Sequence, residues 1–321
     1  MIHNIKEEEI DNKYKVAAFY SFSPINEELI PSLLSQIRSL AQEHDLRGTI
    51  IIALEGINGT ICGSNNGITA MHKQLNSLML APPLDIKFSF TSKQAFRRFK
   101  ARRKNEIVTM GMDGINPNKF SGKYVEPKDW NAFIDDPQTL VIDTRNEYEV
   151  GIGSFQGAIN PHTQSFSEFP RWVEKKLRPL LNQKHPQKIA MFCTGGIRCE
   201  KATSLLIKEG FEEIYHLHGG ILNYLAEVPI DKSRWHGECF VFDHRVALDH
   251  SLSPGVHRLC FACGMPLSPE DIQKTNYLPG IQCHYCKELF SDDDRDRFRE
   301  RQKYITEIKN RQPSNNNWPS A

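Results

Sequence analysis

The sequence predicts an α/β protein with three parts: an amino-terminal α+β domain, a central domain with a parallel sheet, and a small carboxyl-terminal metal-binding extension. Two observations support this prediction. Apolar runs alternate with amphipathic helical patterns over residues 1–228, and four cysteines then follow as two close pairs. The chain has 321 residues and is 39% hydrophobic, which is enough for more than one core.

The amino-terminal domain, residues 1–104, is predicted to have the element order β-α-β-β-α-β. Its patterns indicate strands at 15–20, 49–54, 60–62 and 85–90, and helices at 29–41 and 67–80. The Asn58-Gly59 pair predicts a hairpin turn between the second and third strands. This order is the ferredoxin-like, split βαβ arrangement, which many unrelated functions share.

A linker rich in turn residues, 105–122, separates this domain from the central one, 123–228. The central patterns indicate strands at 140–143, 189–192 and 214–217, and helices at 172–181, 199–209 and 220–225. Such alternation predicts a parallel sheet covered by helices on both faces. Ligands of sheets of this kind bind beyond the carboxyl ends of the strands.

The stretch Cys193-Thr194-Gly195-Gly196-Ile197-Arg198 lies at such an end, between a predicted strand and a predicted helix. Cysteine reacts as its thiolate, so a catalytic Cys193 needs surroundings that lower its pKa. The N–H groups of the turn and the N-terminus of the next helix can stabilise an anion, and Arg198 adds a permanent positive charge. Gly195 and Gly196 permit the positive φ angles of such a loop. The plainer alternative is a buried, unreactive cysteine in an ordinary turn.

Basic residues are concentrated in a short segment that also contains Phe96 and Phe99: Lys93, Arg97, Arg98, Lys100, Arg102, Arg103 and Lys104. The whole chain has a net charge of only +1, so this is a local patch. Basic side chains neutralise phosphates and aromatic rings stack on unpaired bases, which predicts RNA binding by Arg97, Arg98, Lys100, Arg102 and Arg103. The alternative is a solvated edge whose phenylalanines face the core, and both interpretations can hold together.

The pairs Cys260/Cys263 and Cys283/Cys286 are separated by nineteen residues. This spacing is typical of a four-thiolate zinc site, which is closed and therefore structural. The alternative is two unrelated pairs of reduced thiols. The extension is assigned to residues 229–290, and the polar tail, 291–321, is expected to be frayed.

The first fifteen residues carry three consecutive glutamates and no long apolar run, so they are not expected to be a secretory signal. No apolar run in the chain is long enough to span a bilayer. The eight cysteines indicate reduced thiols, metal ligands or catalysis rather than a disulfide framework. We therefore expect a cytoplasmic protein; the sequence does not indicate its oligomeric state.

Residues 123–228 resemble the rhodanese superfamily, through Asp143-Thr144-Arg145, Glu147-Tyr148-Glu149, Gly157-Ala158-Ile159-Asn160, the Cys193 loop and His218-Gly219-Gly220-Ile221. In that superfamily the loop cysteine carries a persulfide. Four residues lie between Cys193 and Arg198, as in sulfur-handling rhodaneses, whereas related phosphatases have five, which disfavours a phosphatase. From about 14 to 287 the chain is similar to the bacterial tRNA uridine hydroxylases, also through Glu55-Gly56-Ile57-Asn58-Gly59-Thr60, Glu106-Ile107-Val108-Thr109-Met110-Gly111 and Glu238-Cys239-Phe240-Val241-Phe242-Asp243.

The resemblance implies an enzyme that converts wobble uridine in the tRNA anticodon loop to 5-hydroxyuridine with molecular oxygen, and Cys193 matches the family's catalytic cysteine. Its thiolate, or a persulfide on it, would add to carbon 6 of uracil and make carbon 5 electron-rich, while Arg198 would stabilise the departing thiolate. No flavin or iron motif is visible, so the source of reducing equivalents stays open. Cys199 fits a structural role or that of a partner for an oxidised Cys193.

Two other classes of function are compatible with these motifs. A persulfide-based sulfurtransferase would deliver sulfur from Cys193 to tRNA or to a small acceptor. An RNA-binding adaptor would keep the rhodanese shell and the zinc site without catalysis. The presence of Cys193, both loop glycines and Arg198 argues against the adaptor.

Overall fold

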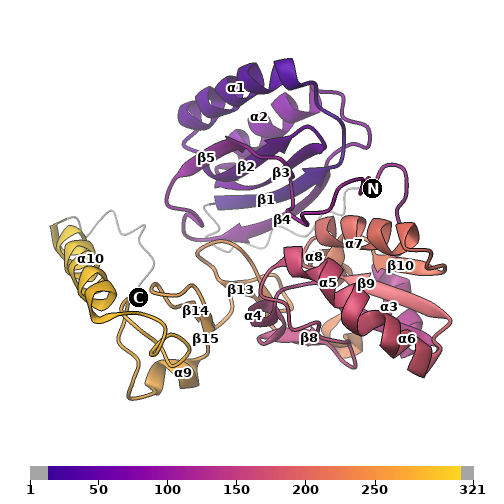
Figure 1. The fold of residues 1–321 in the computed structure, drawn as a ribbon. Helices are drawn as coiled ribbons and strands as arrows, with labels where there is room; N and C mark the ends of the chain where they lie inside the picture. Colours follow the sequence, from indigo (N-terminus) through magenta and orange to yellow (C-terminus); the bar gives the residue numbers. More distant parts are fainter. Residues whose placement is uncertain (1–13, 312–321) are drawn as a thin grey trace. The chain divides into compact units, whose positions relative to one another are not determined.

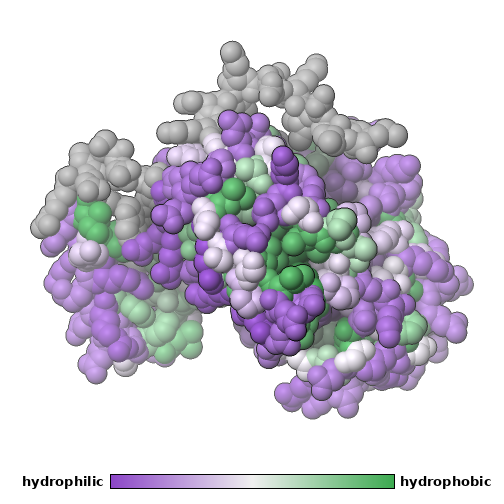
Figure 2. Space-filling model, turned by 90° about the horizontal axis from the view of Figure 1, so that it is seen from above, coloured by the Kyte–Doolittle hydropathy of each residue, from purple (hydrophilic) through white to green (hydrophobic). Residues whose placement is uncertain are grey.

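The computed structural model describes residues 14–311. The chain divides after Ile107 into two compact units, which we describe separately (Figure 1). Hydrophilic residues cover most of the face seen in Figure 2, with smaller apolar patches between them. Within residues 14–311, no helix combines the length and the apolar character that crossing a membrane requires.

The first unit is a five-stranded sheet with two helices on one face (Figure 1). The strand order is β4-β1-β3-β2-β5, and only the pair β2 and β5 is parallel. The elements are β1 (Tyr14–Ser21), α1 (Ile30–Glu43), β2 (Arg47–Ala53), β3 (Gly56–Gly63), α2 (Asn65–Asn76), β4 (Asp85–Thr91) and β5 (Phe99–Arg103). Apolar residues of α1 and α2 pack against one face of the strands to form the core. This confirms the predicted fold class of the amino-terminal part.

Two details of this unit differ from the sequence prediction. The turn between β2 and β3 falls at residues 54–55, so Asn58 and Gly59 lie inside β3 rather than in the turn. Glycine is needed at position 59 because a Cβ there would come within 2.9 Å of the Thr49 carbonyl oxygen. The second difference is β5, which the apolar pattern did not reveal because most of its side chains are charged.

The second unit contains a four-stranded, fully parallel sheet with the order β6-β10-β9-β7. Its elements are β6 (Lys123–Val125), α3 (Pro127–Asp135), β7 (Thr139–Asp143), α4 (Glu147–Val150), α5 (Phe169–Trp172), α6 (Arg178–Lys184), β9 (Lys188–Phe192), α7 (Ile197–Lys208), β10 (Ile214–Leu217) and α8 (Gly220–Glu227). Residues of α5 and α7 cover one face, and residues of α3 and α8 cover the other. The predicted parallel sheet with helices on both faces is therefore confirmed.

Short strand pairs and two helices complete the second unit. The pairs are β8 (Gly153–Phe155) with β11 (Trp235–Gly237), β12 (Cys239–Phe240) with β13 (Ala247–Leu248), and β14 (Arg258–Leu259) with β15 (Pro266–Leu267). A short helix, α9 (Pro269–Gln273), follows, and a long one, α10 (Asp292–Arg311), ends the described chain.

The helix α10 contradicts the prediction of a frayed tail over residues 292–311. The hydroxyl of Ser291 accepts a hydrogen bond from the N–H of Asp294, and three aspartates occupy the first turn, where the helix dipole favours negative charge. Salt bridges between residues three apart continue along the helix, for example Arg295 with Asp292. The rest of the predicted tail, 312–321, lies outside the described residues.

Candidate active site and metal centre

The Cys193 loop joins the end of β9 to the start of α7, and its backbone is hydrogen-bonded to the start of α8. The N–H groups of Ile221 and Leu222, at the start of α8, donate to the carbonyl oxygens of Cys193 and Thr194, at 2.9 and 3.1 Å. Gly220 has φ of 68°, and a Cβ on it would lie 2.8 Å from the Gly196 nitrogen. The conformation of the loop therefore requires a glycine at position 220. Sequence reasoning quoted it only as part of a resemblance and gave it no role.

The sulfur of Cys193 is fully buried and surrounded by hydrogen-bond donors. The Gly196 N–H lies 3.1 Å from Sγ. Burial alone would raise the pKa of the Cys193 thiol. A hydrogen bond from the Cys199 thiol, the charge of Arg198 and the N–H groups of these two residues outweigh burial and lower the pKa to about 5. The loop therefore favours a thiolate at neutral pH.

The two loop glycines serve different purposes. Gly196 has φ of 100°, as predicted, but Gly195 does not adopt a positive φ, so that part of the prediction is wrong. A Cβ at Gly195 would meet nothing within 4 Å, so its position faces open space. Thr194, Gly195 and Ile197 are half-buried, and they form the accessible rim of the loop.

Arg198 is paired with a glutamate rather than left open for an anion. Its guanidinium makes two hydrogen bonds, at 2.6 and 2.8 Å, to the carboxylate of Glu149, which lies in α4 and is fully buried. Burial raises the pKa of Glu149, but the charge and hydrogen bonds of Arg198, with the charge of Arg145 and the N–H of Asn146, together outweigh burial and lower the pKa below its usual range. Arg198 therefore lowers the pKa of Cys193 through the electric field of its positive charge. The sequence indicated Glu149 only as part of the rhodanese resemblance, and not its pairing with Arg198, because the partners are 49 residues apart.

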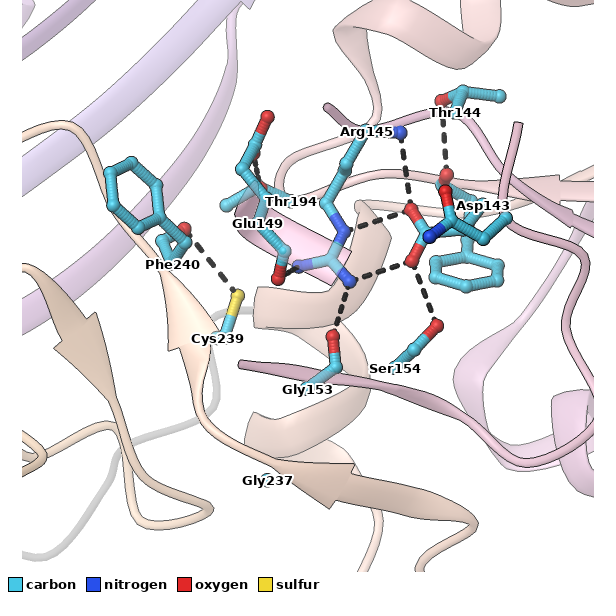
Figure 3. Close-up of polar contacts among 12 residues, drawn as sticks. Asp143, Thr144, Arg145, Glu149, Gly153, Ser154, Thr194, Gly237, Cys239 and Phe240 are labelled. Atoms are coloured by element: carbon cyan, nitrogen blue, oxygen red, sulfur yellow. Dashed lines mark hydrogen bonds and ion pairs between the residues drawn. The ribbon is translucent and has the colours of Figure 1, made fainter. Parts of the chain in front are cut away.

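A second buried ion pair contacts α4, where Arg145 donates a hydrogen bond to the Glu149 carbonyl oxygen at 3.3 Å. Figure 3 shows the guanidinium of Arg145 facing the carboxylate of Asp143, with distances of 2.9 and 2.6 Å. Arg145 also donates to the carbonyl oxygen of Gly153 at 2.6 Å, and Ser154 donates to Asp143 at 2.8 Å. Both charged side chains are fully buried. Their contacts tie the end of β7 to β8, which indicates a role in fixing the fold.

The basic segment lies in the first unit, whereas the Cys193 loop lies in the second. Phe96 and Phe99 are half-buried and pack against cores, while Arg97, Arg98, Arg102 and Arg103 are exposed and Lys100 is half-buried. The charge of Arg98, then burial, then the charge of Arg102 lower the pKa of Lys100. Arg103 also forms a salt bridge with Glu27. The segment therefore combines two half-buried phenylalanines with concentrated positive charge along the edge strand β5 and the residues just before it.

The four cysteines of the extension come together in space. Their sulfur atoms all lie within 4.8 Å of one another, with separations of 4.0 Å for Cys260–Cys286 and 3.7 Å for both Cys263–Cys283 and Cys283–Cys286. A tetrahedral zinc with bonds of about 2.3 Å requires sulfur separations of about 3.8 Å. Three of the four cysteines are buried. The donor set and its geometry therefore fit one zinc ion.

Comparison with known proteins places both units in families. Residues 14–107 match the UPF0176 acylphosphatase like domain, and residues 126–227 match the rhodanese-like domain. A tRNA uridine(34) hydroxylase from one strain of Prochlorococcus marinus is 65% identical over 321 residues, which is 100% of both chains. The chain belongs to the tRNA uridine(34) hydroxylase family.

Other relatives carry the same name. One from a second strain of Prochlorococcus marinus (NATL2A) is 55% identical over 96% of this chain and 97% of its own. One from Synechococcus sp. (strain CC9902) is also 55% identical, over 91% of this chain and 97% of its own. Membership confirms the resemblance inferred from the motifs and the expectation of an enzyme. It also favours the hydroxylase over the sulfurtransferase.

Proposed function

We propose that this protein hydroxylates carbon 5 of the wobble uridine in the anticodon loop of tRNA with molecular oxygen, in the cytoplasm, and that Cys193 is the catalytic nucleophile. The observation that carries this proposal is the Cys193 sulfur, surrounded by N–H donors and held close to a buried arginine. Carbon 6 of uracil accepts soft nucleophiles, and a thiolate that forms easily and also departs easily suits a reversible addition there.

The surroundings of Cys193 support this role. The Gly196 N–H and the charge of Arg198 stabilise the thiolate before addition and again on departure from carbon 6. Two nitrogens of the Arg198 guanidinium are hydrogen-bonded to the Glu149 carboxylate, which fixes the position of the positive charge. The half-buried rim of Thr194, Gly195 and Ile197 is where the base would approach, and Gly195 leaves space for it.

Aromatic side chains near the loop support binding of an unpaired base. Tyr148 precedes Glu149 in α4, and its ring packs edge-on against Phe240 at 5.2 Å between centroids. Phe240 packs in turn against Phe242 at 5.1 Å, and Phe242 is 62% exposed. An exposed ring connected to the loop in this way suits stacking on a base of a single-stranded loop. Arg97, Arg98, Lys100, Arg102 and Arg103 of the first unit would bind phosphates.

The zinc site would be structural. Cys260, Cys263, Cys283 and Cys286 would hold one ion, and a closed site of four thiolates stabilises the fold of the extension.

The test is mass spectrometry of nucleosides from wobble-uridine tRNA incubated with the purified full chain and a thiol reductant, in air and under argon. We expect a gain of one oxygen in air only, and none with Cys193→Ser. The control is Cys62→Ser, because Cys62 is buried in the first unit and accepts a hydrogen bond from Ala95, which a serine can also accept. A gain of sulfur in the presence of a sulfur donor, or hydroxylation by Cys193→Ser, would overturn the proposal.

A further inference from the structure

A second cysteine lies against the sulfur of Cys193. Cys199 is in the first turn of α7 and belongs to the same buried cluster as Cys193, and each thiol shifts the pKa of the other. Both residues are fully buried. The Thr144 hydroxyl lies 3.5 Å from the Cys199 sulfur and also donates to the Phe192 carbonyl oxygen at 3.0 Å, which fixes this side of Cys199. Buried cysteines commonly pack as small apolar side chains, but this one faces a thiolate.

The electron balance of the proposed hydroxylation indicates what the two neighbouring cysteines can supply. When one atom of molecular oxygen enters a carbon–hydrogen bond, the other atom leaves as water, and this requires two electrons and two protons. Two thiols that join as a disulfide release two electrons and two protons. Cys193 and Cys199 are positioned to do so beside the carbon that is oxidised.

We propose that Cys199 is a second catalytic residue, and that the Cys193–Cys199 pair is the immediate two-electron donor of the hydroxylation. This inference rests on the proposed function. The overall reaction is tRNA uridine plus oxygen plus two thiols, giving tRNA 5-hydroxyuridine, water and one intramolecular disulfide. A dithiol reductant then restores the two thiols by disulfide exchange.

The steps balance atom by atom. The Cys193 thiolate forms a bond to carbon 6, and the electron pair displaced onto carbon 5 binds oxygen, which takes up the proton released earlier by Cys193 and becomes a hydroperoxide. The Cys199 sulfur attacks the outer oxygen, the oxygen–oxygen bond breaks, and the thiol proton passes to the oxygen left on carbon 5. Cys199 is now a sulfenic acid.

The remaining steps release the product and close the disulfide. Carbon 5 loses its proton and the bond from carbon 6 to Cys193 breaks, which restores the ring double bond and frees the thiolate. This thiolate attacks the Cys199 sulfenic acid and displaces hydroxide, which takes up the proton from carbon 5 as water.

The two cysteines differ in the way that this sequence requires. Cys193 is the anion that adds to the base, whereas burial and the neighbouring Cys193 raise the pKa of Cys199, which therefore keeps the proton it must deliver. Closing the disulfide requires the two sulfurs to come within about 2.05 Å of each other. The loop between them can adjust, since Gly195 faces open space and Gly196 has the conformational freedom of glycine.

The experiment is a single turnover without added reductant. The full chain with its zinc is reduced, freed of reductant under argon, and mixed with excess wobble-uridine tRNA in aerated buffer. We expect about one 5-hydroxyuridine per chain, with the loss of two thiols and a peptide cross-link between residues 193 and 199. Adding dithiothreitol should convert this burst into repeated turnover. A mixture without tRNA measures disulfide formed by air alone.

In the variant Cys199→Ser, the burst of 5-hydroxyuridine should be at least tenfold smaller than in the wild type. A high concentration of a monothiol should restore part of the activity, because the monothiol can attack the hydroperoxide in place of Cys199. Cys62→Ser should behave as the wild type. A wild-type burst with no thiol consumed, or an undiminished burst from Cys199→Ser, would overturn the role of Cys199 while the proposed function stands. No 5-hydroxyuridine from the wild type even with dithiothreitol would instead overturn the proposed function. The thiol count of the wild type decides the question even if Cys199→Ser does not fold.

Discussion

Replacing Glu149 by glutamine tests the ion pair that holds Arg198 beside the catalytic loop. The change keeps the shape of the side chain but removes the charge that balances the guanidinium, and Arg198 is only 6% exposed. Two hydrogen bonds of 2.6 and 2.8 Å to a carboxylate become contacts with a neutral amide. Breaking one partner of a buried pair costs about 3–5 kcal/mol, because the remaining charge stays desolvated. We expect the free energy of unfolding of the second unit to fall by this amount at neutral pH.

Urea denaturation followed by tryptophan fluorescence measures this loss, since Trp130 and Trp235 are buried in the same unit. The folded-state pKa of Glu149 is lowered, so the contribution of the pair is complete above the ordinary glutamate pKa of about 4.3 and is lost as pH falls through the lower folded value. The difference between wild type and Glu149→Gln should therefore narrow only in acid. The matched control is Glu209→Gln, which breaks the exposed pair with Arg178 and should change stability little. A loss below about 1 kcal/mol for Glu149→Gln would refute the reasoning.

Three further results are expected. Gly220→Ala should abolish most hydroxylation, because its Cβ would collide with the loop backbone. The control is Gly210→Ala, which adds the strain of a positive φ but causes no collision, because a Cβ there has no neighbour within 4 Å. Equal losses of hydroxylation in the two variants would show that the collision is not the cause. Alkylation of Cys193 by a small reagent, followed by peptide mass spectrometry, should rise with pH around a midpoint near 5 and level off by neutrality; a midpoint above 8 would show that the loop does not stabilise the thiolate. Wild-type protein should contain one zinc per chain, and Cys263→Ser should lose it and increase hydrogen exchange over residues 258–290 but not over 188–217; metal retained by the variant would exclude a four-thiolate site.

The sequence predicted those parts of the molecule whose cause is local. Apolar runs such as that ending at Phe192 indicated the strands of the parallel sheet, and the Cys193 loop could be read because its cysteine, glycines and arginine are contiguous. The spacing of the four cysteines in the extension was also enough to predict that they lie close together. In each case, the residues that make the feature are close in sequence or follow a regular period.

The features that were missed depend on long-range contacts or on charge. Glu149 and Gly220 belong to the loop only after the chain has folded, because their partners lie far away in the sequence. Asn58 and Gly59 looked like a turn, yet Gly59 is needed for close packing inside β3. The helix α10 has almost no apolar face, so side-chain pairs and its first-turn aspartates stabilise it instead.

The bonds from α8 to the loop have a consequence for how this site can change during evolution. Because Ile221 and Leu222 bind the carbonyl oxygens of Cys193 and Thr194, the peptide planes of the loop are oriented by backbone atoms alone. The donors that surround the sulfur are likewise mostly main-chain N–H groups. The side chain of Ile197 can therefore be exchanged, in natural variation or by design, to alter which base is admitted while the acidity of the thiol is preserved. Thr194 is more constrained, because its hydroxyl lies 3.4 Å from the Arg198 guanidinium and 3.5 Å from the Glu149 carboxylate.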